Sequence, residues 1–286
     1  MKLIKPKACL IEQAPGLNGI YKQIELAGRT CYKSEDKITD DSAKGFVERM
    51  VKSNHTAMLE HGTLYFWNPV DSCDFEEIRD KYSANKFSAV RIAGQAITTN
   101  YRVIIENGWE DDLYMLTEPT EYHEKRYTFK VNTSIGVTRE FNRHRVNSIA
   151  EQSTRYCNYG KDKFGKEVTF CIPSWMDFEE GSYEWDKYFN NVLVDPSSPA
   201  KDQFIAQCFY AENQYMNLIE KGWKPQQARE VLPLCTATEA VYTAYESDWK
   251  HFFDLRLRGT TGAPHPNMLE LAGLMHDALE QKGIKL

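Results

Sequence analysis

Residues 143 to 155 read Arg143-His-Arg-Val-Asn-Ser-Ile-Ala-Glu-Gln-Ser-Thr-Arg155, which places arginines next to hydroxyl donors. Guanidinium groups stay charged and bind phosphate or carboxylate through two parallel hydrogen bonds. The formal net charge of the whole chain is -6, so this positive charge is local. The alternative is a solvated helix paired with Glu140 and Glu151, but such faces usually contain lysine, and this stretch has none. The pattern favours an anion-binding site.

The residues before this stretch predict a helix that begins at Ser134, a suitable N-cap, and presents residues 143–145 at its C-terminal end. Cations at that end also suit the helix dipole. Two continuations remain open. If the helix continued, one face would hold His144, Ser148, Glu151 and Arg155. If it stopped near Arg145, the rest would be a polar loop whose backbone N–H groups can also bind anions.

Periodicity and turn signals along the chain predict a mixed α/β protein of the α+β kind. Strands are expected at 7–12, 63–67, 87–92, 96–105, 125–131, 167–173 and 237–245. Helices are expected at 16–29, 41–53, 74–82, 199–221, 226–231, 248–257 and 266–281. We expect a central, mostly antiparallel sheet flanked by helices, and one domain that spans residues 1–286. A doubly wound nucleotide fold is not indicated, because no Gly-x-Gly-x-x-Gly follows a strand.

Composition excludes several classes of protein. A pI near 5.7 argues against non-specific nucleic-acid binding. The N-terminus shows no signal peptide, and no window approaches the roughly 20 apolar residues that a membrane helix needs, so we expect a cytoplasmic protein with no membrane partner. The seven cysteines are scattered without a Cys-x-x-Cys pair, and His55 and His61 are too far out of phase to share a helix face. We therefore expect no metal.

The stretch from Arg143 to Arg155 resembles the signature of the flavin-dependent thymidylate synthases, Arg-His-Arg-x-x-Ser-x-x-x-x-Ser-x-Arg, at every fixed position. Three further blocks resemble that family in the same order. They are His55-Thr-Ala-Met-Leu-Glu60-His61, Ala228-Arg229-Glu-Val-Leu-Pro233 and Trp249-Lys-His-Phe-Phe-Asp-Leu-Arg256. Together the blocks cover nearly the whole chain.

The chain also departs from the family pattern. Ala150 stands where many members carry an asparagine that helps to hold the flavin. Residues 68–130 lie between the upstream block and the signature, where the family usually has a short connection, which implies an insertion. The histidine that normally follows the closing arginine closely is displaced to His265.

The resemblance implies an enzyme that methylates dUMP to dTMP, with FAD as cofactor and with NADPH and methylenetetrahydrofolate as co-substrates. It also implies a homotetramer with active sites shared between subunits. The cofactor-binding residues would be His55, Glu60, Arg143, His144, Arg145, Ser148, Glu151 and His265. The substrate-binding residues would be Glu140, Ser153, Arg155, Arg229 and Arg256. Arg256 would be the catalytic residue, because a guanidinium at the carbonyl edge of the pyrimidine stabilises negative charge while carbon 5 becomes nucleophilic.

Two other functions remain as alternatives. The first is a nucleotide-binding relative without catalysis, which Ala150 and the displaced His265 would favour. The second is a cysteine-dependent transferase that uses Cys235, which follows Leu232-Pro-Leu. A thiol nucleophile needs a base or a lowered pKa, and no histidine follows Cys235, so a buried inert thiol is the preferred interpretation.

Overall fold

A computed structural model describes residues 1–190 and 193–286. The strands are β1 (Lys2–Ile4), β2 (Lys7–Ile11), β3 (Thr63–Trp67), β4 (Ala89–Arg91), β5 (Ala96–Asn100), β6 (Leu116–Thr117), β7 (Arg126–Ser134), β8 (Ser148–Glu151), β9 (Thr169–Cys171), β10 (Gly181–Ser182) and β11 (Ala237–Tyr245). The helices are α1 (Gly16–Tyr32), α2 (Ser42–Lys52), α3 (Phe75–Ala84), α4 (Tyr101–Asn107), α5 (Ile135–Phe141), α6 (Trp185–Phe189), α7 (Ala200–Glu220), α8 (Pro225–Ala228), α9 (Glu246–Arg256) and α10 (Pro266–Glu280). No helix in these ranges is long and apolar enough to cross a membrane.

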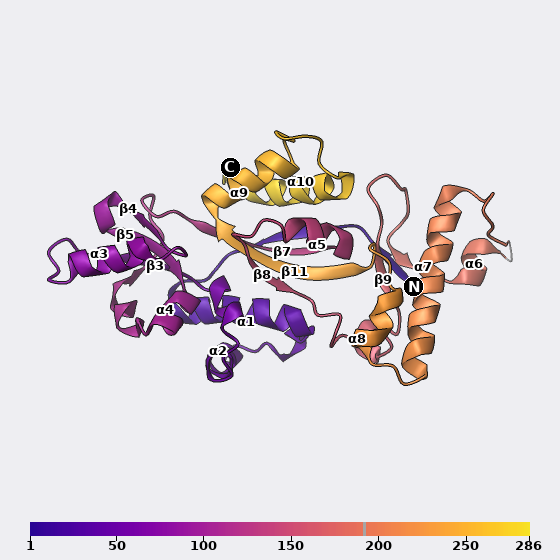
Figure 1. Ribbon diagram of the computed structural model, residues 1–286, viewed down its shortest axis with the longest axis horizontal. Helices are drawn as coiled ribbons and strands as arrows, with labels where there is room; N and C mark the ends of the chain where they lie inside the picture. The colour runs from indigo at the N-terminus through magenta and orange to yellow at the C-terminus, as the bar shows by residue number, and fades with distance from the viewer. Residues whose placement is uncertain (191–192) are drawn as a thin grey trace.

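The central sheet has the strand order β2-β7-β11-β8 and is antiparallel throughout. Helices α5, α9 and α10 lie over one face, and α1 lies under the other (Figure 1). Alternate residues of β7 and β11, including Phe129 and Tyr242, are fully buried and pack against Trp249 of α9. This is the layered arrangement that buries the apolar face of an antiparallel sheet, and it confirms the expected mixed α/β fold.

Two smaller sheets flank the central one (Figure 1). The sheet with the order β4-β5-β3-β6 is built entirely from residues 63–117 and packs with α1, α3 and α4 around its own core. The sheet with the order β10-β1-β9 lies beside α7 and α8 at the other end of the molecule. Strands β4, β5 and β6 of this sheet, together with α3 and α4, come from the segment that we predicted as an insertion, whereas β7, from Arg126 onward, belongs to the central sheet.

The predicted strand at 96–105 is wrong in its second half, because the chain turns into α4 at Tyr101. The Asn100 side chain caps this helix by accepting a hydrogen bond from the N–H of Val103 at 3.2 Å, and Gly108 ends it in the left-handed conformation. Asparagine is among the best N-cap residues, and glycine is the usual residue just past a helix end. The N-cap and the C-terminal glycine favour a helix, and they outweigh the preference of the β-branched residues between them for a strand.

Candidate functional site

The signature stretch follows a short helix and enters a strand. The Ser134 hydroxyl accepts a hydrogen bond from the N–H of Val137 at 3.3 Å, as an N-cap does, and α5 ends at Phe141. The chain then turns, with Arg143 and Arg145 exposed, before β8 begins at Ser148. Both predicted continuations are wrong for residues 148–151, which pair with β11 as an edge strand. Because side chains alternate along a strand, the shared helical face does not exist.

His144, Arg256 and Glu140 form the first cluster. The Arg256 Nε–H donates to His144 Nε2 at 3.1 Å, and the Arg256 Nη1 atom lies 3.5 Å from the Glu140 Oε2 atom. Arg256 comes from the end of α9, and its side chain is only 18 % exposed. The structure thus brings together a catalytic, a substrate-binding and a cofactor-binding residue of the prediction, although 112 positions separate His144 from Arg256.

The imidazole of His144 is held neutral. Its pKa is lowered to about 4, first by burial and then by the nearby charges of Arg256, His251 and Arg143. Because Nε2 accepts from Arg256, the ring proton lies on Nδ1. His144 can therefore position the arginine as a neutral acceptor and does not add to the positive charge of the site.

A stack of aromatic rings supports this cluster. Phe141 stacks on Tyr242 with ring centroids 3.8 Å apart and on Phe252 with centroids 4.6 Å apart. The ring of His144 meets Phe252 edge-on at 5.1 Å. All three supporting rings are fully or almost fully buried. Close packing of this kind limits the orientation of His144, and hence that of Arg256.

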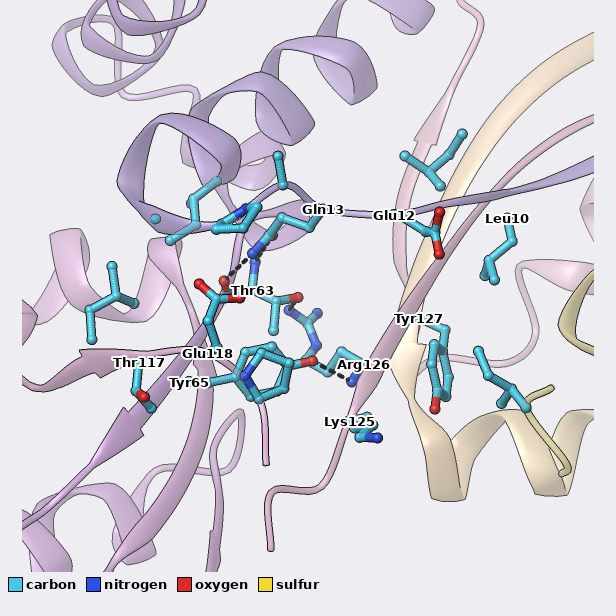
Figure 2. A pocket seen from close by; sticks show the side chains of 18 residues that line it. Leu10, Glu12, Gln13, Thr63, Tyr65, Thr117, Glu118, Lys125, Arg126 and Tyr127 are labelled. Atoms are coloured by element: carbon cyan, nitrogen blue, oxygen red, sulfur yellow. Dashed lines mark hydrogen bonds between the residues drawn. The ribbon is translucent and has the colours of Figure 1, made fainter. Parts of the chain in front are cut away.

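Arg126 organises a second group of predicted residues, and sequence reasoning missed it. Its Nη1 donates to the Glu60 carbonyl at 3.1 Å and to Thr63 Oγ1 at 3.2 Å, while its Nη2 donates to Ser148 Oγ at 3.2 Å. Figure 2 shows the guanidinium close to Thr63 and Tyr65 in the wall of a cavity of about 260 Å³. Arg126 stands at the first position of β7, outside every family block, so only its contacts reveal its role.

The far side of Arg126 faces a larger cavity of about 660 Å³. Its lining includes the predicted cofactor residues Glu60, Arg145 and Ser148. The carboxylate of Glu60 is paired with Arg102 at 2.5 Å. A buried donor in this wall, the Asn147 side-chain amide, has no hydrogen-bond partner among the described residues. A cavity of this size with an exposed cation fits an anionic ligand of cofactor dimensions.

Residues 150 and 151 face different surroundings. The Glu151 carboxylate accepts hydrogen bonds from the Thr138 hydroxyl at 2.8 Å and from the Asn142 amide at 3.3 Å, which ties β8 to α5. Ala150 is buried against Ala27 of α1 and Val241 of β11. The small residue at position 150 lets α1 approach the sheet closely, which gives a packing reason for the departure from the family pattern.

The predicted phosphate-binding residues gather at the other end of β8. Arg229 donates from Nη1 to the Thr154 hydroxyl at 2.9 Å, which places it beside Ser153 and Arg155. The N–H of Ser153 donates to the carbonyl of Cys31 at 2.8 Å. The Arg155 side chain is exposed, so its guanidinium is accessible. These residues lie close to one another, and the hydrogen bond that Arg229 makes is separate from those of Arg256.

His55 lies near this third group. It is exposed at the start of a 3₁₀ turn, Thr56–His61, and lines a cavity of about 410 Å³ together with Cys31 and Tyr32. Cys31 is the residue whose carbonyl binds Ser153. His55 thus stands on the same side as the predicted phosphate site, while Glu60 of the same block lies in the wall of the 660 Å³ cavity.

His265 stands apart from the other predicted residues. It is exposed at the N-cap of α10, and its ring lies edge-on to Trp175 with centroids 5.9 Å apart. Within residues 1–190 and 193–286, no hydrogen bond or ion pair joins it to the signature. Its predicted contact with a flavin stays a prediction.

Cys235 has a thiol neighbour and lacks a base. Its Sγ lies 3.9 Å from that of Cys208, whose S–H lowers the pKa of Cys235, while its own pKa is raised. No histidine contacts Cys235 in the part of the chain that the structure describes. A nucleophilic role would need a general base or exposure, and Cys235 is half-buried.

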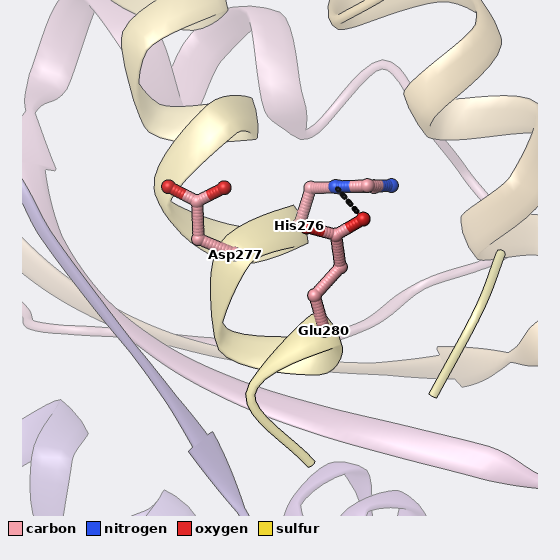
Figure 3. Close-up of side chains that lie close together, drawn as sticks. All are labelled: His276, Asp277 and Glu280. Carbon is pink, nitrogen blue, oxygen red and sulfur yellow. Dashed lines mark ion pairs between the residues drawn. The ribbon is translucent and has the colours of Figure 1, made fainter. Parts of the chain in front are cut away.

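Three potential metal ligands, His276, Asp277 and Glu280, lie together on α10 (Figure 3). The His276 Nδ1 atom is 3.8 Å from the Glu280 carboxylate, and both acids are exposed. Exposed groups at this spacing on one helix are ordinary surface ion pairs. The cluster shares no contact with the signature residues among those described.

Comparisons with known proteins place this site in a family. Residues 101–282 match the model of the family described as thymidylate synthase complementing protein. A flavin-dependent thymidylate synthase from Tropheryma whipplei (strain TW08/27) is 27 % identical over 165 residues, which cover 56 % of this chain and 64 % of that protein. One from Pyrococcus furiosus is 28 % identical over 169 residues, which cover 57 % and 61 %. The chain thus spans less than two thirds of the length of these relatives.

A UMP/dUMP methylase, PolB from Streptomyces cacaoi, bound with 5-Br dUMP, is similar over 98 % of this chain and 93 % of its own, with 17 % identity and a TM-score of 0.45. This likeness is too low to support a function. The family model, in contrast, covers most of the chain and includes the signature, Arg229 and Arg256. The chain belongs to the family of thymidylate synthase complementing proteins, which confirms its resemblance to the flavin-dependent thymidylate synthases.

Proposed function

We propose that the protein is a flavin-dependent thymidylate synthase, a methyltransferase that converts dUMP to dTMP with FAD as cofactor and with NADPH and methylenetetrahydrofolate as co-substrates. The observation that carries this proposal is the pairing of Arg256 with a neutral His144. Arg256 keeps its charge, and its second contact, Glu140, is a longer ion pair that a ligand can replace. A positioned guanidinium of this kind can stabilise a developing pyrimidine anion.

Different residues of the chain would bind the cofactor and the substrate. Arg143, Arg145 and Ser148, with Glu60 beside them, would hold the FAD. Bound flavin, once reduced, supplies the hydride. Ser153, Arg155 and Arg229 would hold the dUMP phosphate, and Glu140 would bond a hydroxyl of the substrate or orient Arg256. Catalysis then rests on positioning and electrostatics, which fits a site without a base-activated nucleophile.

The separation of the clusters supports a shared active site. Arg256 contacts the start of the signature, whereas Arg229 contacts its end, on the far side of β8. Arg143, Arg145 and Arg155 are exposed. An arrangement in which neighbouring copies complete each site, as in the predicted homotetramer, would bring the arginines that hold FAD and those that hold dUMP into one active site. We place this activity in the cytoplasm, in keeping with its seven free cysteines.

The test is direct. The purified protein should be yellow or take up FAD, and it should oxidise NADPH only when dUMP is present. Binding of dUMP without flavin under any condition would favour the non-catalytic relative. Loss of activity on alkylation of Cys235, with protection by dUMP, would favour the cysteine-dependent transferase.

A further inference from the structure

The lining of the 660 Å³ cavity comes from different parts of the chain. It includes the signature residues Arg145, Val146 and Ser148, and it also includes the loop from Lys86 to Ala89 before β4. This loop belongs to the segment that we predicted as an insertion. The family signature supplies only part of the residues that line the cavity. The role of the loop residues in the lining therefore does not follow from the signature.

The loop is held by hydrogen bonds to Tyr245 at the end of β11 and to Thr99 of β5. The Tyr245 hydroxyl lies 2.9 Å from the carbonyl of Phe87 and 3.0 Å from that of Thr98, so its single proton can be donated to either carbonyl or shared between them. The N–H of Phe87 donates to the Asn85 side chain at 2.9 Å, and the hydroxyls of Ser88 and Thr99 are 2.8 Å apart. The side chains of residues 86 and 87 take no part in these bonds. They can therefore contact a ligand, or be replaced, without release of the loop.

The side chains of Lys86 and Phe87, which make none of these hydrogen bonds, are a cation and an aromatic ring. Phe87 is 51 % exposed, and the Lys86 Nζ atom lies 4.8 Å from the centre of its ring. In the same lining, Val146 is 63 % exposed and directly follows Arg145. An exposed phenylalanine at the rim of a cavity is the surface on which a planar ring stacks.

The charges of the lining favour an anion. Neither Lys86 nor Arg145 has an ion-pair partner within residues 1–190 and 193–286. Of the two acids in the lining, Glu60 is paired with Arg102, and Asp248 is half-buried with a pKa that burial raises. Arg126 adds a third cation, although its guanidinium also donates hydrogen bonds to the Glu60 carbonyl and the Ser148 hydroxyl. Two cations that line one cavity, and that pair with no acid among the described residues, can together hold a diphosphate.

We propose that Lys86 and Phe87 bind an adenine dinucleotide in this cavity together with Arg145, with the diphosphate between Lys86 and Arg145 and an aromatic ring of the ligand stacked on Phe87. This inference rests on the proposed function, which uses two adenine dinucleotides, FAD and NADPH. Both carry the same diphosphate and adenine, so the experiment must separate them.

The experiment titrates the full-length protein with FAD and, separately, with NADPH, and follows the fluorescence of each ligand. The variants are Lys86→Ala, Lys86→Arg and Phe87→Ala. The matched controls are Lys44→Ala, an exposed lysine on α2, and Tyr114→Ala, an exposed aromatic residue within the same segment. Thermal unfolding of each variant checks that the loop substitutions leave the fold intact.

We expect Lys86→Ala to weaken binding of the dinucleotide by about tenfold or more, because a charge-assisted bond is lost, and to reduce the salt dependence of binding. Lys86→Arg should restore most of both. Phe87→Ala should weaken binding by roughly threefold to tenfold, and both controls should bind as the unchanged protein does. An effect on FAD alone or on NADPH alone identifies the ligand of this cavity.

Two outcomes are distinct failures. If the unchanged protein binds FAD and NADPH but the affinities of the Lys86 and Phe87 variants match those of the controls, the inference is overturned while the proposed function stands. If the unchanged protein binds neither dinucleotide, the proposed function itself fails. Equal losses in the Tyr114→Ala control would also overturn the inference, because the effect would then belong to the stability of the segment as a whole.

Discussion

Replacement of Arg256 by glutamine tests the central cluster. Glutamine is shorter and neutral, so Arg256→Gln removes the guanidinium that donates to His144 at 3.1 Å and faces Glu140 at 3.5 Å. Loss of one preorganised donor at a developing anion typically lowers kcat by about 10² to 10³. We expect a loss of that size, with FAD affinity changed by less than about threefold, because Arg256 is assigned to the substrate and not to the cofactor.

The same substitution should move the pKa of His144 by a bounded amount. The pKa stands at about 4 against an ordinary value of 6.5, and burial is the largest cause, followed by Arg256. Removal of the Arg256 charge should therefore raise the pKa of His144, and burial, His251 and Arg143 should still keep it below the ordinary value.

The assay is a pH titration of His144 by NMR in the unchanged protein and in Arg256→Gln, alongside steady-state kinetics of NADPH oxidation with dUMP. Arg258→Gln is a suitable control, because Arg258 lies near the same helix end but pairs with Asp254 on the surface. A kcat within tenfold of the unchanged protein would refute the catalytic role. An unchanged pKa of His144 would refute the contact on which the role is built.

Three further predictions follow from buried groups. Phe141→Ala should lower the free energy of unfolding by about 3–5 kcal/mol, measured by urea titration, because it leaves a cavity in a closed aromatic stack. Acidification should destabilise the fold: burial lowers the pKa of His61 to about 3 and that of His144 to about 4, so their stabilisation is complete above pH 6.5 and is lost as the pH falls through those values. Thermal unfolding between pH 7 and pH 4 would reveal this, and His61→Gln should flatten the dependence. Arg126→Met should cost about 2 kcal/mol or more in the same urea assay and weaken FAD binding, because Ser148 and the carbonyl of Glu60 lose a charged donor; equal stability of the variant and the unchanged protein would contradict this.

Many helices and strands could be predicted from the sequence alone, because they depend on interactions between neighbouring residues. Ser134 as a cap, Pro199 at the start of the long α7 and the alternation of β11 each predict an element from a few neighbouring positions. The order of the signature blocks likewise predicts the family, because fixed residue types at fixed spacing do not depend on the fold around them. Most elements and the family were therefore predictable before any coordinates.

Contacts between distant residues decided the rest. Residues 148–151 form a strand because β11 offers an unpaired edge, and nothing within thirteen positions of the signature contains that information. The role of Arg126 and the neutral state of His144 depend on partners that are far away in the sequence: Glu60 and Ser148 for the arginine, Arg256 for the histidine. Hydrogen bonding to an edge strand, burial and the fields of distant charges arise only when the chain is packed, and for that reason the tertiary structure alone sets them.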